Sequence, residues 1–206
     1  DSAPDITLAL NKALIKNRLE PVDESTVRTY IGNGSKELIT DILKRKELKI
    51  DQATFSSIHK VFVDAYRNNF FFYSTLYPYV STTLAKLALT FNLVCLTNKP
   101  STITNLILGN KDLAKHFRLT IAADIFSKRK PSPHGVLFSA QKFDCRLRDI
   151  LLIGDSVVDM QTARNAGVRS IGVEYGYANG ANLIEEGALT TITCFRKIPR
   201  ILKDIF

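Results

Sequence analysis

The chain has 206 residues, 45% of them hydrophobic and 23% charged, and a formal net charge of +8. This length and balance indicate a soluble globular protein, either one α/β domain or a core with a small insert. No apolar run approaches the roughly 18 residues that a transmembrane helix requires, so we expect neither a membrane span nor a membrane partner.

The cysteines and the distribution of charge indicate the cellular compartment and the kinds of partner to expect. Cys95, Cys145 and Cys194 are widely spaced, and no two have the spacing of metal ligands, which predicts free thiols in a reducing cytoplasm. The first residues have neither the basic nor the apolar region of a signal peptide. The basic clusters at residues 44–46 and 128–130 are not interleaved with aromatic side chains, so we expect no nucleic-acid partner.

The first 72 residues are predicted to be helical. Ser2 in the cap position, with Pro4 and Asp5 in the first turn, indicates a helix start. The apolar stripe that follows comprises Ile6, Leu10, Ala13 and Leu14. Three more helices are predicted, over residues 23–31, from residue 35 and from residue 51.

From residue 77 onward, helices alternate with short apolar runs. The runs that predict buried strands cover residues 93–96, 119–122, 150–153 and 170–173. Strands alternating with helices at this spacing imply right-handed crossovers and a parallel sheet. The fold class is therefore α/β, with a parallel sheet flanked by helices.

Two carboxylates follow the predicted strand at residues 150–153. Asp155 and Asp159 stand where that strand ends and a helix begins, and ligands of open α/β sheets bind at such strand ends. Carboxylate oxygens are the ligands that Mg²⁺ prefers, so the pair predicts a metal site. The alternative is that Asp155 turns the chain and Asp159 caps the helix or faces water.

Polar groups at other strand ends predict an anion site. Thr97 and Asn98 end the first predicted strand, and Lys130 precedes a helix. A hydroxyl, an amide nitrogen, an ammonium and helix N-termini together suit a phosphate group. Taken one at a time, Thr97 could be a helix cap and Lys130 a solvated charge.

Three motifs together carry a family resemblance. They are Leu-Thr-Asn-Lys-Pro at residues 96–100, Lys-Pro-Ser-Pro at 130–133 and Gly-Asp-Ser-Val-Val-Asp at 154–159. With residues 30–34, 76–80 and 175–177, they make nearly the whole chain resemble the haloacid dehalogenase superfamily of phosphatases, most of all phosphoglycolate phosphatase. The resemblance implies a Rossmann-like core over residues 1–7 and 73–206 and an all-helical cap domain over residues 8–72.

The resemblance also implies roles for individual residues. Thr97, with the backbone that follows it, would hold the phosphoryl group, and Lys130 would neutralise the phosphate. Asp155 would bind Mg²⁺, and Asp159 would bind it or orient its waters. The three cap residues that would contact the rest of the substrate are Gly32, Asn33 and Gly34.

The family's first motif is a strand followed by Asp-x-Asp-Gly-Thr-x-x-Asp, and only its end resembles residues 1–2. The resemblance therefore places the nucleophile, the general acid and the first central strand before residue 1. Neither Asp1 nor Asp5 follows an apolar strand that could position it as a nucleophile. We therefore expect this chain to be N-terminally truncated and inactive as given.

The predicted function is Mg²⁺-dependent hydrolysis of 2-phosphoglycolate through an aspartyl-phosphate. Two alternatives stay open: another phosphatase with the same cap, acting on pyrophosphate or a sugar phosphate, or a non-catalytic relative that only binds phosphorylated ligands. Either way, the expected partner is a small phosphorylated metabolite. The sequence leaves open whether the chain is a monomer or a homodimer.

Overall fold

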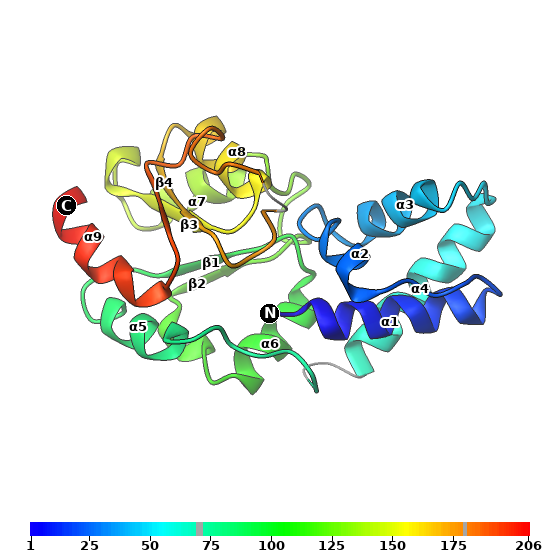
Figure 1. Ribbon diagram of the computed structural model, residues 1–206. Coiled ribbons are helices and arrows are strands. Elements are labelled where there is room, and N and C mark those ends of the chain that lie inside the picture. Colours follow the sequence, from blue (N-terminus) through cyan, green and yellow to red (C-terminus); the bar gives the residue numbers. More distant parts are fainter. Residues whose placement is uncertain (69–71, 179–180) are drawn as a thin grey trace.

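A computed structural model describes residues 1–68, 72–178 and 181–206, and Figure 1 shows its two lobes. Helices α1 (Ala3–Lys16), α2 (Glu24–Arg28), α3 (Ser35–Arg45) and α4 (Gln52–Asn68) form the helical lobe. The helices of the sheet lobe are α5 (Val80–Leu87), α6 (Ser101–Asn110), α7 (His134–Lys142), α8 (Val157–Ala166) and α9 (Ile198–Ile205). Its strands are β1 (Val94–Leu96), β2 (Leu119–Ile121), β3 (Leu151–Gly154), β4 (Arg169–Val173) and β5 (Thr190–Ile192).

The helical lobe is built around its own apolar core. The stripe of α1 packs against α4, and Leu10, Ile39 and Ile58 are fully buried in one cluster that all four helices share. The predicted helices are therefore confirmed, because each buries the apolar face that its spacing defines. None of the helices in the described parts of the chain is long and apolar enough to cross a membrane.

The strands of the sheet lobe are parallel, as predicted, and form two sheets. β1 pairs with β2, with Leu96 opposite Ile121, and the second sheet has the order β3-β4-β5. Helices flank these strands (Figure 1), which confirms the α/β class. The short strand β5 was not predicted, because its Thr-Thr-Ile sequence is too short for a pattern and its pairing with β4 is a long-range contact.

The strands β1 and β3 each leave one edge unpaired within the described residues. Every residue of β1 and β3 is only half-buried, whereas four of the five residues of β4 are fully buried. Interior strands of parallel sheets are normally buried on both faces. A further strand beside β1 and β3, which the family resemblance implies, remains a prediction.

The start of α1 connects the two lobes. Ser2 holds the N-cap position, but its side chain makes no capping hydrogen bond; its backbone N–H instead donates to the Tyr177 hydroxyl (2.9 Å). Asp5 lies in the first turn as predicted, and it is also buried and accepts a hydrogen bond from the Ser74 backbone N–H (2.7 Å). The domain boundary predicted between residues 7 and 8 falls inside the continuous helix α1 and stays a prediction.

We predict that Ile171→Ala destabilises the fold by about 2–5 kcal/mol, the usual cost of truncating a fully buried aliphatic side chain. Ile171 is fully buried in β4, the middle strand of its sheet. Ile15→Ala is the matched control, because Ile15 is 60% exposed. Urea unfolding measures both free energies, and equal losses in the two variants would contradict this account of the core.

Candidate active site

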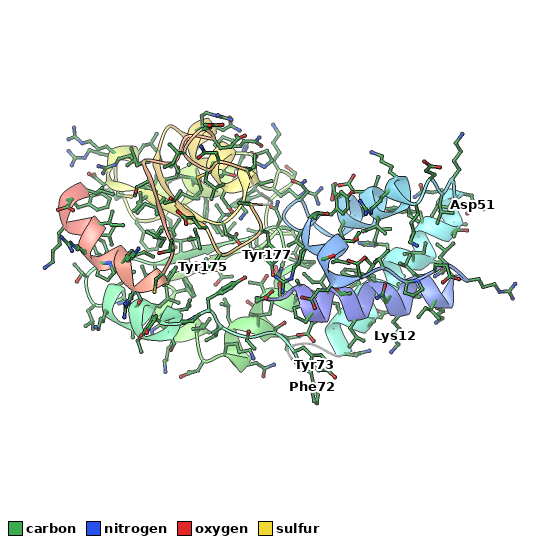
Figure 2. The ribbon with its side chains drawn as sticks, viewed as in Figure 1. Lys12, Asp51, Phe72, Tyr73, Tyr175 and Tyr177 are labelled. Carbon is green, nitrogen blue, oxygen red and sulfur yellow. The ribbon has the colours of Figure 1, made fainter. Side chains whose placement is uncertain are left out.

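A cavity of about 170 Å³ lies where the two lobes meet. Figure 2 shows Tyr177 at this junction, whereas Lys12 and Asp51 lie far out on the helical lobe. The helical lobe contributes Ile6, Ile31, Gly32, Gly34, Ser35, Leu38, Phe62, Val63 and Tyr66. The sheet lobe contributes Thr97, Asn98, Lys99, Pro100, Ile103, Lys130, Asp155, Ser156, Asp159 and Tyr177. One wall is therefore mostly apolar and the other mostly polar.

The cavity brings together nearly all the residues predicted for the site. From the sheet lobe these are Thr97, Asn98, Lys130, Asp155 and Asp159, and from the helical lobe Gly32 and Gly34. The exception is Asn33, which is exposed and does not line the cavity. Residues from three separate loops of the sheet lobe thus converge at one place, as expected for parallel strands whose carboxyl ends share an edge.

Thr97 follows β1 and is held by backbone hydrogen bonds. Its N–H donates to the Ile121 carbonyl (2.9 Å), and its hydroxyl oxygen accepts from the Lys99 N–H (3.1 Å). The hydroxyl proton is therefore left to donate into the cavity. The alternative of a helix cap is wrong for Thr97, because Pro100 holds the N-cap position of α6.

Asp159 joins two loops of the site. One of its oxygens, Oδ1, accepts from the Lys130 ammonium (2.6 Å), and these side chains are only 8% and 12% exposed. The other oxygen, Oδ2, accepts from the backbone N–H groups of Asp155 and Ser156 (3.2 Å each) and from the Ser156 hydroxyl (2.7 Å). Asp159 thus completes a capping box at the start of α8, and Lys130 is a buried partner rather than a solvated charge.

The pKa values of this pair follow from burial and mutual attraction. Burial alone would raise the pKa of Asp159, but the charge and hydrogen bond of Lys130 outweigh it and hold that pKa below its ordinary value. Burial likewise opposes the charged form of Lys130, and Asp159 raises the Lys130 pKa above its ordinary value. Both side chains are therefore charged at neutral pH.

Asp155 lies only four residues from Asp159 but differs from it in its partners and in the direction of its pKa shift. Within the described residues it has no ion-pair partner, and its Oδ2 accepts one hydrogen bond, from the Tyr177 N–H (3.2 Å). Burial raises the pKa of Asp155 above its ordinary value, and the charge of Asp159 adds to that effect. The charges of Lys130 and Lys99 offset these two effects only in part, so a metal ion beside the carboxylate would relieve them further.

The Asn98 side chain makes contacts within the protein, and its predicted role in binding substrate stays a prediction. Its side-chain nitrogen donates to the carbonyls of Gly32 and Lys130 (3.1 Å each), so the amide nitrogen is used within the protein. It thereby ties the helical lobe to the loop that carries Lys130. The Asn98 Oδ1 atom is buried and has no hydrogen-bond partner among the described residues.

Lys99 and Tyr177 are site residues that the motif-by-motif reasoning did not single out. The Lys99 ammonium lines the cavity; burial lowers its pKa, and attraction to Asp155 opposes that shift. Tyr177 holds Asp155 through its backbone, and Gly176 before it allows this approach, since a Cβ there would lie 2.1 Å from Asp155 Oδ2. The available signal was the sequence Tyr-Gly-Tyr at residues 175–177.

Comparison with known proteins places the chain in a family. Residues 1–173 match the model of the haloacid dehalogenase-like hydrolases. The chain belongs to this family. The chain is also similar to proteins named phosphoglycolate phosphatase, which confirms the resemblance found in the sequence. The protein of that name from Vibrio parahaemolyticus is 33% identical over 184 residues, which cover 87% of this chain and 81% of that protein.

Two further relatives cover almost the whole chain. The phosphoglycolate phosphatase of Chromobacterium violaceum is 29% identical over 206 residues, covering 99% of this chain and 91% of its own. The crystal structure of a predicted phosphoglycolate phosphatase from Haemophilus somnus superposes with a TM-score of 0.91 at 29% identity, covering 98% of this chain and 92% of that one. These matches support a phosphatase with a small phosphorylated substrate.

We predict that Asp159→Asn destabilises the fold at pH 7 by about 3–5 kcal/mol, because it leaves the buried Lys130 charge without its partner. Asp159 has a lowered pKa in the folded state, so its contribution is present above the unfolded value of about 4 and is lost as the pH falls through the folded pKa. The difference in stability between the wild type and the variant should therefore shrink below pH 4.

Urea unfolding at pH 7 and pH 3 measures this difference. Asp149→Asn is the matched control, because Asp149 pairs with Arg146 at the surface and should contribute at most about 1 kcal/mol. A difference between wild type and Asp159→Asn that is unchanged at pH 3 would argue against the assigned charge state.

Proposed function

We propose that the protein is a Mg²⁺-dependent phosphomonoesterase that hydrolyses 2-phosphoglycolate to glycolate and phosphate. The observation that carries the proposal is the convergence of Thr97, Lys130 and Asp155 on one cavity between the lobes. The names of the relatives from Vibrio parahaemolyticus and Chromobacterium violaceum support the choice of substrate. In this proposal the helical lobe is the cap domain and the sheet lobe is the phosphatase core.

The sheet lobe would bind the phosphoryl group. The Thr97 hydroxyl has a free proton, and the Asn98 backbone N–H has no hydrogen-bond partner among the described residues. Both donors suit phosphate oxygens. Lys130 would add its positive charge while Asp159 holds its ammonium in place.

The charges of the cavity favour a metal ion together with a phosphate dianion. Two lysines, Lys99 and Lys130, balance the two carboxylates of Asp155 and Asp159. Mg²⁺ is usually bound by one or two carboxylates together with substrate phosphate and water, so Asp155 fits the role of its ligand. When bound, the ion would neutralise charge on the phosphoryl group during transfer.

Asp159 fits a positioning role rather than that of a metal ligand. Both of its oxygens already accept hydrogen bonds from Lys130 and from the loop that carries Asp155. Within the described residues, no group of three or more histidine, cysteine, aspartate or glutamate side chains could hold a metal. The proposed site therefore has one carboxylate from this chain, and the phosphate itself supplies further ligands.

The nucleophile of the proposed reaction is the aspartate that the family resemblance places before residue 1. Its oxygen would bond to phosphorus as the bond from phosphorus to the glycolate oxygen breaks, and the general acid of the same motif would protonate that oxygen. Water would then attack phosphorus, break the bond to the aspartate and release phosphate. A second cavity, of about 240 Å³, could hold this carboxylate. It adjoins the first cavity, because Thr97, Lys99 and Tyr177 line both. Cys95 of β1 and Lys99, whose ammonium has no ion-pair partner among the described residues, also line this second cavity.

Phosphate release with Mg²⁺ tests the enzymatic proposal. We expect the 206-residue chain to be nearly inactive on 2-phosphoglycolate, because covalent catalysis needs its nucleophile. A version extended by an apolar strand and the Asp-x-Asp motif should turn over at about 1–1000 per second. Ordinary turnover by the chain as given would overturn the assigned nucleophile, and faster turnover of pyrophosphate or a sugar phosphate would replace the proposed substrate.

We predict that Thr97→Val weakens the binding of 2-phosphoglycolate about 10-fold or more, because it removes a hydrogen bond to a charged oxygen. Valine keeps the shape of threonine but cannot accept the hydrogen bond of the Lys99 N–H, so circular dichroism checks that the fold is preserved. The control is Thr82→Val, since Thr82 is exposed on α5. Calorimetric titration of this chain in Mg²⁺ measures both affinities, and unchanged binding in Thr97→Val would remove Thr97 from the phosphate site.

A further inference from the structure

One ion pair between the lobes lies beside the loop that carries Lys130. Arg129, the residue before Lys130, donates from its guanidinium to Oε1 of Glu37 in the first turn of α3. The side chains of Arg129 and Glu37 are 37% and 40% exposed, so the pair lies at the rim of the junction. Neither is among the described residues that line the two cavities. The pair therefore joins the lobes without lining either cavity itself.

Glu37 differs from an ordinary solvated acid at the start of a helix. Its second oxygen, Oε2, is buried and has no hydrogen-bond partner among the described residues. The guanidinium of Arg129 lies against the same turn, since a Cβ at Gly34 would be only 2.9 Å from Arg129 Nη1. A carboxylate partly withdrawn from water depends on its cation. Glu37 and Arg129 thus hold each other in place.

The backbone that follows Arg129 is fixed by the sheet lobe. The Lys130 carbonyl accepts a hydrogen bond from the Asn98 side chain (3.1 Å), and the Pro131 carbonyl accepts one from the Asn165 side chain (2.9 Å). Both donors belong to the sheet lobe, whereas the partner of Arg129 belongs to the helical lobe. A shift between the lobes would therefore break the ion pair or pull on the backbone next to Lys130.

We propose that Glu37 is a positioning residue for phosphate binding and acts through Arg129. With the lobes together, the ion pair holds the loop that brings Lys130 to the cavity. This inference rests on the proposed function, because it takes Lys130 as part of the phosphate site. The helical lobe then influences phosphate affinity, although none of the described residues that it contributes to the cavity is charged.

The proposed role predicts the opposite of what net charge alone would give. Glu37 precedes Leu38, which lines the cavity, so removing its negative charge would strengthen phosphate binding if only Coulomb forces acted. If Glu37 positions the loop, Glu37→Met should instead weaken phosphate binding about 5-fold or more, the lower end of usual coupling between two sites. Methionine keeps the length of glutamate and suits a helix.

Calorimetric titration of this chain with inorganic phosphate in Mg²⁺ measures the affinity. Phosphate is the probe because it has no further group that could contact the helical lobe. Glu37→Gln, which can keep the hydrogen bond without the charge, should fall between the wild type and Glu37→Met. In an Arg129→Met background, Glu37→Met should have no further effect, because residues that act through one contact are not additive.

Glu186→Met is the matched control, because Glu186 pairs with Arg164 within the sheet lobe and is 33% exposed. It removes the same charge and should leave phosphate affinity unchanged. Urea unfolding should give all the Glu37 variants a stability close to that of the wild type, since partly exposed ion pairs contribute little. A merely structural role for Glu37 would lower stability together with affinity.

Unchanged or tighter phosphate binding by Glu37→Met would overturn the positioning role and leave the phosphatase proposal standing. The same loss on removing Glu37 with and without Arg129 would overturn the route through Arg129. Failure of the wild type to bind phosphate in Mg²⁺ would overturn the proposed function itself, and the positioning role with it.

Discussion

The buried ion pair between Asp159 and Lys130 is the interaction on which the rest of the site depends. Removing either partner would leave a charge in a place from which water is excluded, and that is far more costly than losing a surface pair. The pair also has a geometric effect. One Asp159 oxygen holds the ammonium from the loop before α7, and the other holds the N–H groups of the loop after β3.

The position of the helical lobe depends on a second buried polar group. Asn98 donates to Gly32 in that lobe and to Lys130 in the sheet lobe, so the loop that follows β1 contacts both. Gly32 and Gly34 have φ values of +138° and +102°, a backbone conformation that glycine adopts without strain. The apolar wall they adjoin lowers the local dielectric, which strengthens each hydrogen bond in the cavity.

Periodic and local features could be predicted from the sequence. The helices α1 to α4 follow from apolar stripes, and the strands β1 to β4 from apolar runs, because those patterns record which faces are buried. Thr97, Lys130 and Asp155 could be predicted because they follow strands or loops that open on one edge of the sheet. Each of these inferences needed only neighbouring residues.

Long-range contacts could not be predicted in the same way. Tyr66 lies on the buried face of α4, and in the sequence it is indistinguishable from a core aromatic such as Phe62. The bridging role of Asn98 depends on a glycine 66 positions away, and β5 depends on pairing with β4 rather than on its own three residues. For Asp159, the sequence offered a metal ligand and a helix cap as alternatives; the cap is a local contact with Ser156, and only the ion pair with Lys130 is a long-range contact.

The two carboxylates at residues 155 and 159 show how tertiary contacts give different properties to the same side chain. Both are buried, yet the Asp159 pKa is lowered by Lys130 and the Asp155 pKa is raised by burial and by Asp159. Two neighbouring titratable groups whose environments shift their pKa values in opposite directions often have different chemical roles. Here the ionised Asp159 holds the two loops together, and its negative charge makes the ionised form of Asp155 less stable unless a cation lies nearby. Lys130 is engaged by Asp159, and the charges of Lys130 and Lys99 offset the raised pKa of Asp155 only in part. In the proposed function, the further cation for Asp155 would be a metal ion bound together with phosphate.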